Sequence, residues 1–121
     1  MDNFVRVLLV HDARYDLSEV YDALRKQFIL RLATNVDDAV EVARTVLIGA
    51  VVCASGGSVR AREIYDRLVA ESAERAERFV FVRSETSDDD DAVFFLTAGK
   101  TWLPWPVSPA DVVAGVHLIC K

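Results

Sequence analysis

Short apolar runs alternate with segments of helical periodicity along the whole sequence, and this alternation limits the folds open to the chain. The runs are residues 4–10, 28–33, 49–54, 79–82 and 102–104. Several are nearly continuous and rich in β-branched residues, which is typical of strands covered on both faces. Strands that alternate with helices form a parallel sheet with helices on both of its faces. The pattern therefore predicts an α/β fold of the (βα)5 doubly wound type.

The helical segments carry start signals that support this pattern. Asn35 stands before a segment with two acids in its first turn, and Ser108 stands before Pro109 and another acid. Asp16 and Glu19 have the spacing of a capping box. For a chain of this length, the usual solution is the flavodoxin-like strand order 2-1-3-4-5, with its site at the carboxyl ends of the strands. We expect one domain over residues 1–121.

Composition narrows the range of functions. The chain has 14 Lys and Arg against 19 Asp and Glu, a net charge of -5, which argues against direct contact of this domain with nucleic acid. Cys53 and Cys120 have neither metal-ligand spacing nor the density of a disulfide framework. No apolar stretch approaches the ~20 residues that span a bilayer, and the first residues do not resemble a signal peptide. We expect a cytoplasmic domain without membrane contact or cofactor.

Four stretches occur in an order and spacing that point to a known family. They are residues 7–12, 49–54, 79–83 and 99–107, the last with Trp102 at an aromatic position and Pro106 at a proline. Together they resemble the receiver domain of two-component response regulators over essentially the whole chain. The resemblance implies the receiver version of the flavodoxin-like fold, and it implies a cis peptide between Trp105 and Pro106.

The resemblance also implies a phosphorylation pocket, and this chain has changed it. The family places two acids, an acceptor Asp, a Thr or Ser and a Lys around one point. The matching positions here are His11, Asp12, Ala54, Arg83 and Trp105. The methyl group of Ala54 can neither attack a phosphoryl group nor bind a metal. One carboxylate and one imidazole are a poor set of ligands for Mg²⁺. We therefore predict a degenerate pocket with no catalytic residue and no metal.

Three features near this pocket have two interpretations each. The guanidinium of Arg83 can reach Asp12 across the vacated pocket and replace both Mg²⁺ and the Lys, or it can be solvated. The loop Ser55-Gly56-Gly57-Ser58 resembles an anion-binding nest, but it lacks the Lys of a phosphate loop, so we favour a simple turn. The acids at 88–91 lack the alternating oxygen ligands of a calcium loop, and we expect a solvated helix start.

Aromatic residues gather near the fourth helix and the fifth strand. Two adjacent Phe residues should not both point inward from one helix, so we expect part of this set to be exposed as an interaction surface. The set is Phe94, Phe95, Trp102 and Trp105.

The function that we expect is that of a non-phosphorylatable pseudo-receiver, not an enzyme. It would belong to a bacterial signal-transduction or transcription regulator. It would bind a protein partner, or a second copy of itself, through the fourth helix, fifth strand and fifth helix. Two alternatives stay open: a small flavodoxin-like protein that binds a nucleotide or anion at Ser55–Ser58, and a receiver that responds to Mg²⁺ or a phosphodonor by an unorthodox route.

Overall fold

The computed structural model describes residues 5–83, 89–97, 102–104 and 106–120, and it confirms the predicted fold class. A five-stranded parallel sheet has the order β2-β1-β3-β4-β5. The strands are β1 (Arg6–Val10), β2 (Ile29–Ala33), β3 (Ala50–Ser55), β4 (Phe79–Arg83) and β5 (Trp102–Pro104). The helices are α1 (Ser18–Arg25), α2 (Val36–Thr45), α3 (Ala61–Glu71), the 3-10 helix η1 (Ala73–Glu77), α4 (Asp89–Thr97) and α5 (Pro109–Ile119).

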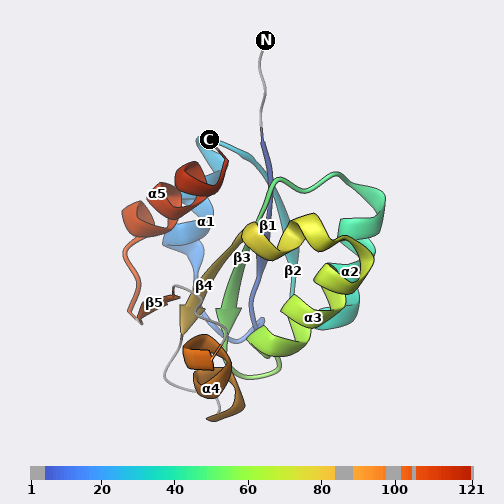
Figure 1. Cartoon of the computed structure of the whole chain (residues 1–121). Helices are drawn as coiled ribbons and strands as arrows, with labels where there is room; N and C mark the ends of the chain where they lie inside the picture. The colour runs from blue at the N-terminus through green and yellow to red at the C-terminus, as the bar shows by residue number, and fades with distance from the viewer. Residues whose placement is uncertain (1–4, 84–88, 98–101, 105, 121) are drawn as a thin grey trace.

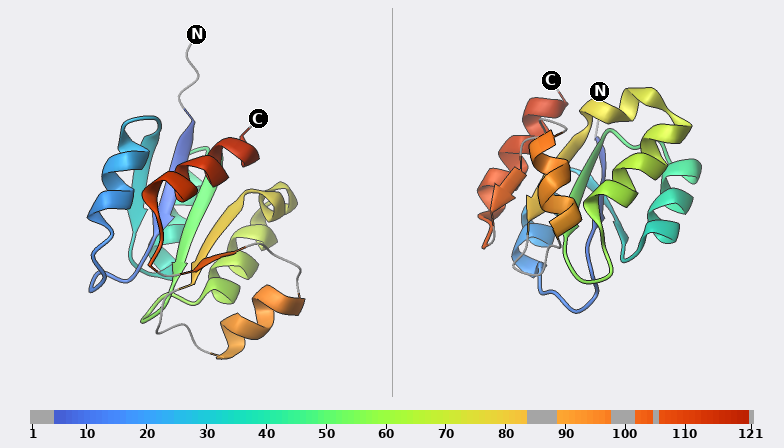
Figure 2. Two further views of the ribbon diagram at one scale, coloured as in Figure 1. Left: turned by 90° about the vertical axis from the view of Figure 1, so that its left-hand side faces the viewer. Right: turned by 60° about the horizontal axis from the view of Figure 1, so that its bottom comes forward.

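The sheet separates two apolar cores. Helices α1 and α5 cover one face, α2 and α3 cover the other, and α4 lies at the end toward which the strands run (Figure 1; Figure 2). Successive residues of a strand point to opposite faces. In β3, accordingly, Cys53 packs in the core beneath α2 and α3, whereas Ala54 packs in the core beneath α1 and α5. All of β3 is buried, as its apolar run predicts.

The helix starts agree with the sequence in part. Asn35 caps α2 by accepting a hydrogen bond from the Asp38 amide at 2.8 Å, as predicted. Asp16 instead accepts from the amide of Ser18 at 3.0 Å, two residues on, before α1 begins. This is a local turn and not the predicted capping box. Pro109 is the first residue of α5, where its missing N–H costs no hydrogen bond.

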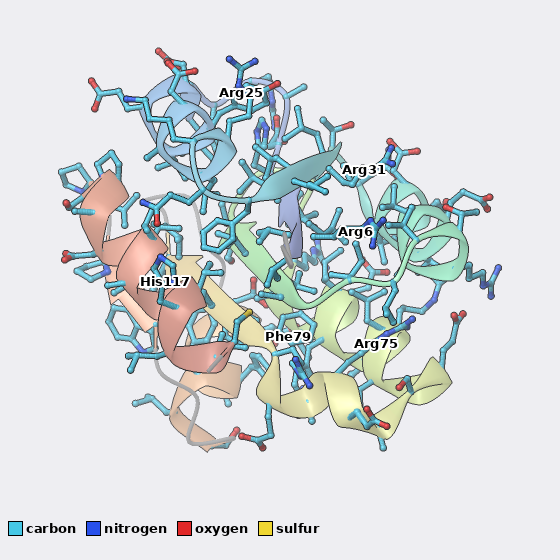
Figure 3. The ribbon with its side chains drawn as sticks, turned by 90° about the horizontal axis from the view of Figure 1, so that it is seen from above. Arg6, Arg25, Arg31, Arg75, Phe79 and His117 are labelled. Atoms are coloured by element: carbon cyan, nitrogen blue, oxygen red, sulfur yellow. The ribbon has the colours of Figure 1, made fainter. Side chains whose placement is uncertain are left out.

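An arginine joins the ends of two helices near the amino-terminal edge of the sheet. Figure 3 looks down on this edge and shows Arg75 beside α2 and α3. Its Nη1 donates to the carbonyl of Leu68 at 3.0 Å, and its Nη2 donates to the carbonyl of Ala43 at 3.1 Å. The last carbonyls of a helix have no partner within it, so one guanidinium satisfies both helix ends.

Helix α4 corrects one prediction about the aromatic residues. Phe94 and Phe95 are both buried, with exposed fractions of 7% and 2%. Their rings lie 5.6 Å and 5.3 Å from the ring of Phe81. Adjacent helical residues are separated by about 100°, so they can lie on either side of the line where the helix meets the sheet. Among the α4 side chains that the structure describes, the exposed apolar ones are Val93 and Leu96.

Among the residues described, no helix has the length and apolar character needed to cross a membrane. The longest, α3 and α5, have 11 residues each.

Candidate functional site

Four of the five predicted pocket positions lie at the carboxyl edge of the sheet. His11 and Asp12 follow β1 directly, and Arg83 is the last residue of β4. Ala54 lies near the end of β3, where the next residue pairs with Arg83. The fifth position, Trp105, lies outside the described residues, and so does the peptide that it forms with Pro106.

Ala54 is part of the apolar core and offers no chemistry. Its side chain is buried in the core that contains Val52 and Val82, beneath α1 and α5. The neighbouring hydroxyl of Ser55 points to the opposite face, as predicted from strand alternation. Ser55 therefore does not replace an acceptor at position 54.

Asp12 is the centre of a closed polar cluster. Its side chain is buried, with 3% of the residue exposed. Oδ1 accepts from the Arg14 amide at 2.8 Å and from Arg14 Nε at 3.0 Å. Oδ2 accepts from Arg14 Nη2 at 3.0 Å and from the Ser58 amide at 2.7 Å. This bidentate arrangement with two added amides engages both carboxylate oxygens.

The hydrogen bonds to Arg14, and then the amide of Ser58, hold the pKa of Asp12 well below its usual range. The same pair raises the pKa of Arg14. Donors that bind the charged form of an acid favour that form. Asp12 therefore keeps its negative charge, and Arg14 keeps the positive charge that neutralises it.

Of the two interpretations left open for Arg83, the pairing with Asp12 is not found. The guanidinium of Arg83 lies over the ring of Trp102 instead, 5.6 Å from its centroid, in a cation–π contact. Arg14 is the basic partner, and it is only two residues from Asp12 along the chain. Sequence reasoning missed it because the family pattern directs attention to the ends of the strands and not to the loop after β1.

The loop after β3 is a tight turn. The amide of Gly56 donates to the Val59 carbonyl at 2.9 Å, and the amide of Val59 donates back at 3.0 Å. Gly57 has a φ of +59°, a conformation that favours glycine. A Cβ on Gly57 would lie 2.2 Å from Asp12 Oδ2. The next amide, that of Ser58, binds the carboxylate of Asp12, so the protein supplies its own anion here.

A second carboxylate binds the same segment from the other side. Asp91 is 1% exposed, and it accepts a hydrogen bond from the Ser55 hydroxyl. It also accepts from the amides of Ala61 at 2.7 Å and Arg62 at 3.1 Å, the first two residues of α3. Asp91 thus caps a helix other than its own. The predicted solvated helix start is wrong for Asp91, whereas Asp90 is exposed as expected.

One signal in the sequence pointed toward this contact. The residue before α3 is Arg60, which makes no side-chain cap to that helix. The first amides of a helix need acceptors when the helix start is buried. The absence of a cap at Arg60 therefore predicts that another segment supplies an acceptor for them. Nothing in the sequence identifies Asp91 among the neighbouring acids as that partner.

The residues present do not fit the Mg²⁺ ion that the fold family implies. Both oxygens of Asp12 already accept hydrogen bonds, Ala54 has no ligand atom, and His11 Nδ1 lies 2.9 Å from the Asp12 carbonyl. Among the described residues, no group of three or more His, Cys, Asp or Glu side chains is placed to hold a metal. Cys53 is no substitute nucleophile, because burial and the charge of Asp91 raise its pKa.

Comparisons with known proteins support the fold. No protein-family model matches the chain, and no curated protein matches it in sequence. The structure is similar to a CheY-like response regulator receiver domain protein of Methanospirillum hungatei JF-1, with a TM-score of 0.78 and 15% identity over 96% of this chain and 93% of that one. It is also similar to the signal receiver domain of a modulated diguanylate cyclase of Desulfovibrio desulfuricans G20, with a TM-score of 0.75 and 17% identity over 98% and 94%.

A third similar structure is the signal receiver domain of an HD domain-containing protein from Pseudomonas fluorescens Pf-5. The TM-score is 0.79, with 12% identity over 97% of this chain and 94% of that chain. At such identities the likeness concerns the fold. The chain has the receiver fold of signal-transduction regulators.

Proposed function

We propose that the chain is a pseudo-receiver, which keeps the receiver fold but acts through protein contact without aspartyl phosphorylation. The observation that carries this proposal is the closed cluster of Asp12, Arg14 and Ser58, together with the apolar, buried Ala54 at the acceptor position. A permanent guanidinium neutralises the carboxylate that a receiver of the usual type would offer to a metal. The acceptor oxygen is absent as well. In the described part of the chain, the pocket therefore lacks both a free carboxylate to bind the metal and an oxygen to accept the phosphoryl group.

The outer faces of the helices support a binding role for one side of the molecule. Helices α1, α2 and α3 expose charged side chains, as surface helices normally do. In contrast, α4 exposes Val93 and Leu96, at 54% and 77%, and α5 exposes Leu118. Exposed apolar faces mark interaction sites. We propose that α4, β5 and α5 form the face that binds a protein partner in a bacterial regulator, with a second copy of this chain as the first partner to test.

This assignment replaces the residues first expected at the interface. Phe94 and Phe95 belong to the core, so the contacts would come from Val93 and Leu96, the neighbours that α4 exposes. Trp102 is half-buried between Phe95 and Arg83, which makes it a supporting residue of this face.

The first test asks whether the pocket responds to phosphorylation chemistry. Intrinsic tryptophan fluorescence is followed during titration with Mg²⁺ and then with beryllofluoride, and intact mass is measured after incubation with acetyl phosphate. We expect no saturable change and no added phosphoryl group. A saturable response or a phosphorylated species would overturn the pseudo-receiver proposal.

The second test concerns the binding face. Light scattering over a range of concentrations compares the wild-type chain with Leu96→Asp and with the matched control Leu47→Asp. Leu47 is also exposed, at 85%, but it lies between α2 and β3. We expect association that Leu96→Asp abolishes and Leu47→Asp preserves. Equal effects of the two variants, or a wild-type monomer at every concentration, would refute self-association through α4.

A further inference from the structure

The contact between Asp91 and the start of α3 connects the degenerate pocket at the end of β3 with α4, the helix of the proposed binding face. Ser55 directly follows Ala54 at the carboxyl end of β3, and Asp91 lies in the first turn of α4. Through one carboxylate, the end of β3, the start of α3 and helix α4 are held together. The carboxylate also lies at the positive end of the α3 dipole, where a negative charge is favoured.

The geometry makes this contact specific. Oδ2 of Asp91 accepts from both the Ser55 hydroxyl and the Ala61 amide, while Oδ1 accepts from the Arg62 amide. A side chain that satisfies these donors together fixes both the position and the rotation of the first turn of α4. The aromatic contacts of Phe94 and Phe95 with Phe81 hold the next turn. Apolar contacts are less directional than hydrogen bonds. The polar contact of Asp91 is therefore the one that specifies the rotation of α4 about its axis and its position along α3.

Water has access to the edge of this contact. A surface pocket of about 600 Å³ lies between α3 and α4, and its lining includes Asp91, Asp90 and Arg62. A buried contact that lines a surface pocket can exchange its partners for water without unfolding of the sheet.

We propose that Asp91 is a latch that fixes α4 in one position, and that opening this latch, without phosphorylation, is the event that changes the outer face of α4. The consequence for partner binding rests on the proposed function, because it takes Val93 and Leu96 as the binding residues. The latch itself rests only on the contacts of Asp91. With the latch closed, α4 presents its outer face continuously.

Amide hydrogen exchange followed by mass spectrometry tests the latch in the intact chain. The variants are Asp91→Ala and Ser55→Ala, and the matched control is Asp90→Ala, because Asp90 is an exposed acid in the same turn. We expect exchange of the α4 amides to become at least about tenfold faster in Asp91→Ala, with unchanged protection in β1 and β3. Ser55→Ala should show a smaller rise in α4, and Asp90→Ala should match the wild type.

Each result decides the proposal. If exchange in α4 stays at the wild-type rate, or rises only in step with β1 and β3, the latch is refuted. If Asp91→Ala does not fold, Ser55→Ala decides the matter by the same criterion, since it keeps the two amide contacts of Asp91.

The latch and the proposed function can fail separately. Faster exchange confined to α4, with no association sensitive to Leu96→Asp, would leave the latch standing and refute the binding face. Association sensitive to Leu96→Asp, with wild-type exchange in Asp91→Ala, would do the reverse.

Discussion

Replacing Phe95 by Ala tests the arrangement of α4 most directly, because the next residue serves as its control. Phe95 is 2% exposed, and its ring lies 5.3 Å from that of Phe81 and 6.0 Å from that of Trp102. Truncation of a buried Phe to Ala costs about 3–5 kcal/mol. We expect the lower part of this range, about 3 kcal/mol, because α4 lies at the edge of the core and can partly close the cavity. Leu96→Ala should change the free energy of unfolding by less than about 0.5 kcal/mol.

Urea denaturation followed by circular dichroism measures both variants. For a chain of 121 residues, the entropy of unfolding of ~0.25 kcal/mol/K converts 3 kcal/mol into a fall in Tm of about 12 °C. The slope of the urea transition should stay constant, so that the shift in midpoint reports stability alone. The reasoning is refuted if Phe95→Ala costs less than about 1 kcal/mol or if Leu96→Ala costs as much. Either result would mean that α4 exposes the face assigned here to the core.

Three further predictions concern the loops and the helix ends. Gly57→Ala should lower the free energy of unfolding, measured in urea, by at least about 1–2 kcal/mol, because Gly57 has a positive φ and an added Cβ would clash with Asp12. The control Ser58→Ala should change it by less than about 0.5 kcal/mol. The pKa of Asp12 is lowered by folding, so its stabilisation is complete above the unfolded pKa of ~3.9 and is lost as the pH falls below that value. In Asp12→Asn, the urea midpoint should therefore fall less steeply as the pH is lowered below that value. A slope equal to that of the wild type would contradict the attribution of this pH dependence to Asp12. Arg75→Ala should cost about 1–3 kcal/mol by freeing two helix-end carbonyls, and a loss below about 0.5 kcal/mol would contradict that role.

The fold could be predicted because its signals are local. Apolar runs such as residues 49–54 predict a buried strand from composition alone, and β3 occupies Ala50–Ser55. Asn35 predicts the start of α2 because a cap and its partner lie three residues apart. The strand order followed from the number of strand–helix units and the length of the chain.

The partners of the two carboxylates could not be predicted in the same way. Asp91 and Ala61 are 30 residues apart, and their contact depends on how α4 is placed against α3. Four neighbouring acids look alike in the sequence, and only the three-dimensional arrangement distinguishes the buried Asp91 from the exposed Asp90. Arg14 is close to Asp12 in sequence, but its guanidinium meets the carboxylate in a turn, in which the Tyr15 amide donates to the Asp12 carbonyl at 3.0 Å, and no residue pattern in the sequence predicts that turn.

The prediction for Phe94 and Phe95 was wrong because it assumed that a helix buries a single line of side chains. A helix that meets a sheet across a broad ring such as that of Phe81 buries a sector instead, and two adjacent residues about 100° apart can share that sector. The exposed residues then follow on either side, which places Val93 and Leu96 outward. For an apolar helix, the sequence alone does not identify which pair of adjacent residues is buried.

The segment between β3 and α3 is bound by two carboxylates of the chain itself, whereas a ligand-binding site takes its anion from solution. Asp12 binds it through the Ser58 amide, and Asp91 binds it through Ser55 and the first amides of α3. Both anions belong to the chain, so their effective concentration is fixed by folding and not by a ligand in solution. A ligand shifts an equilibrium only by binding two states differently. Here the groups that a metal or phosphoryl ligand would have to displace are covalently attached side chains of the chain itself. If the proposed function holds, a signal would act on the contacts of α4 instead.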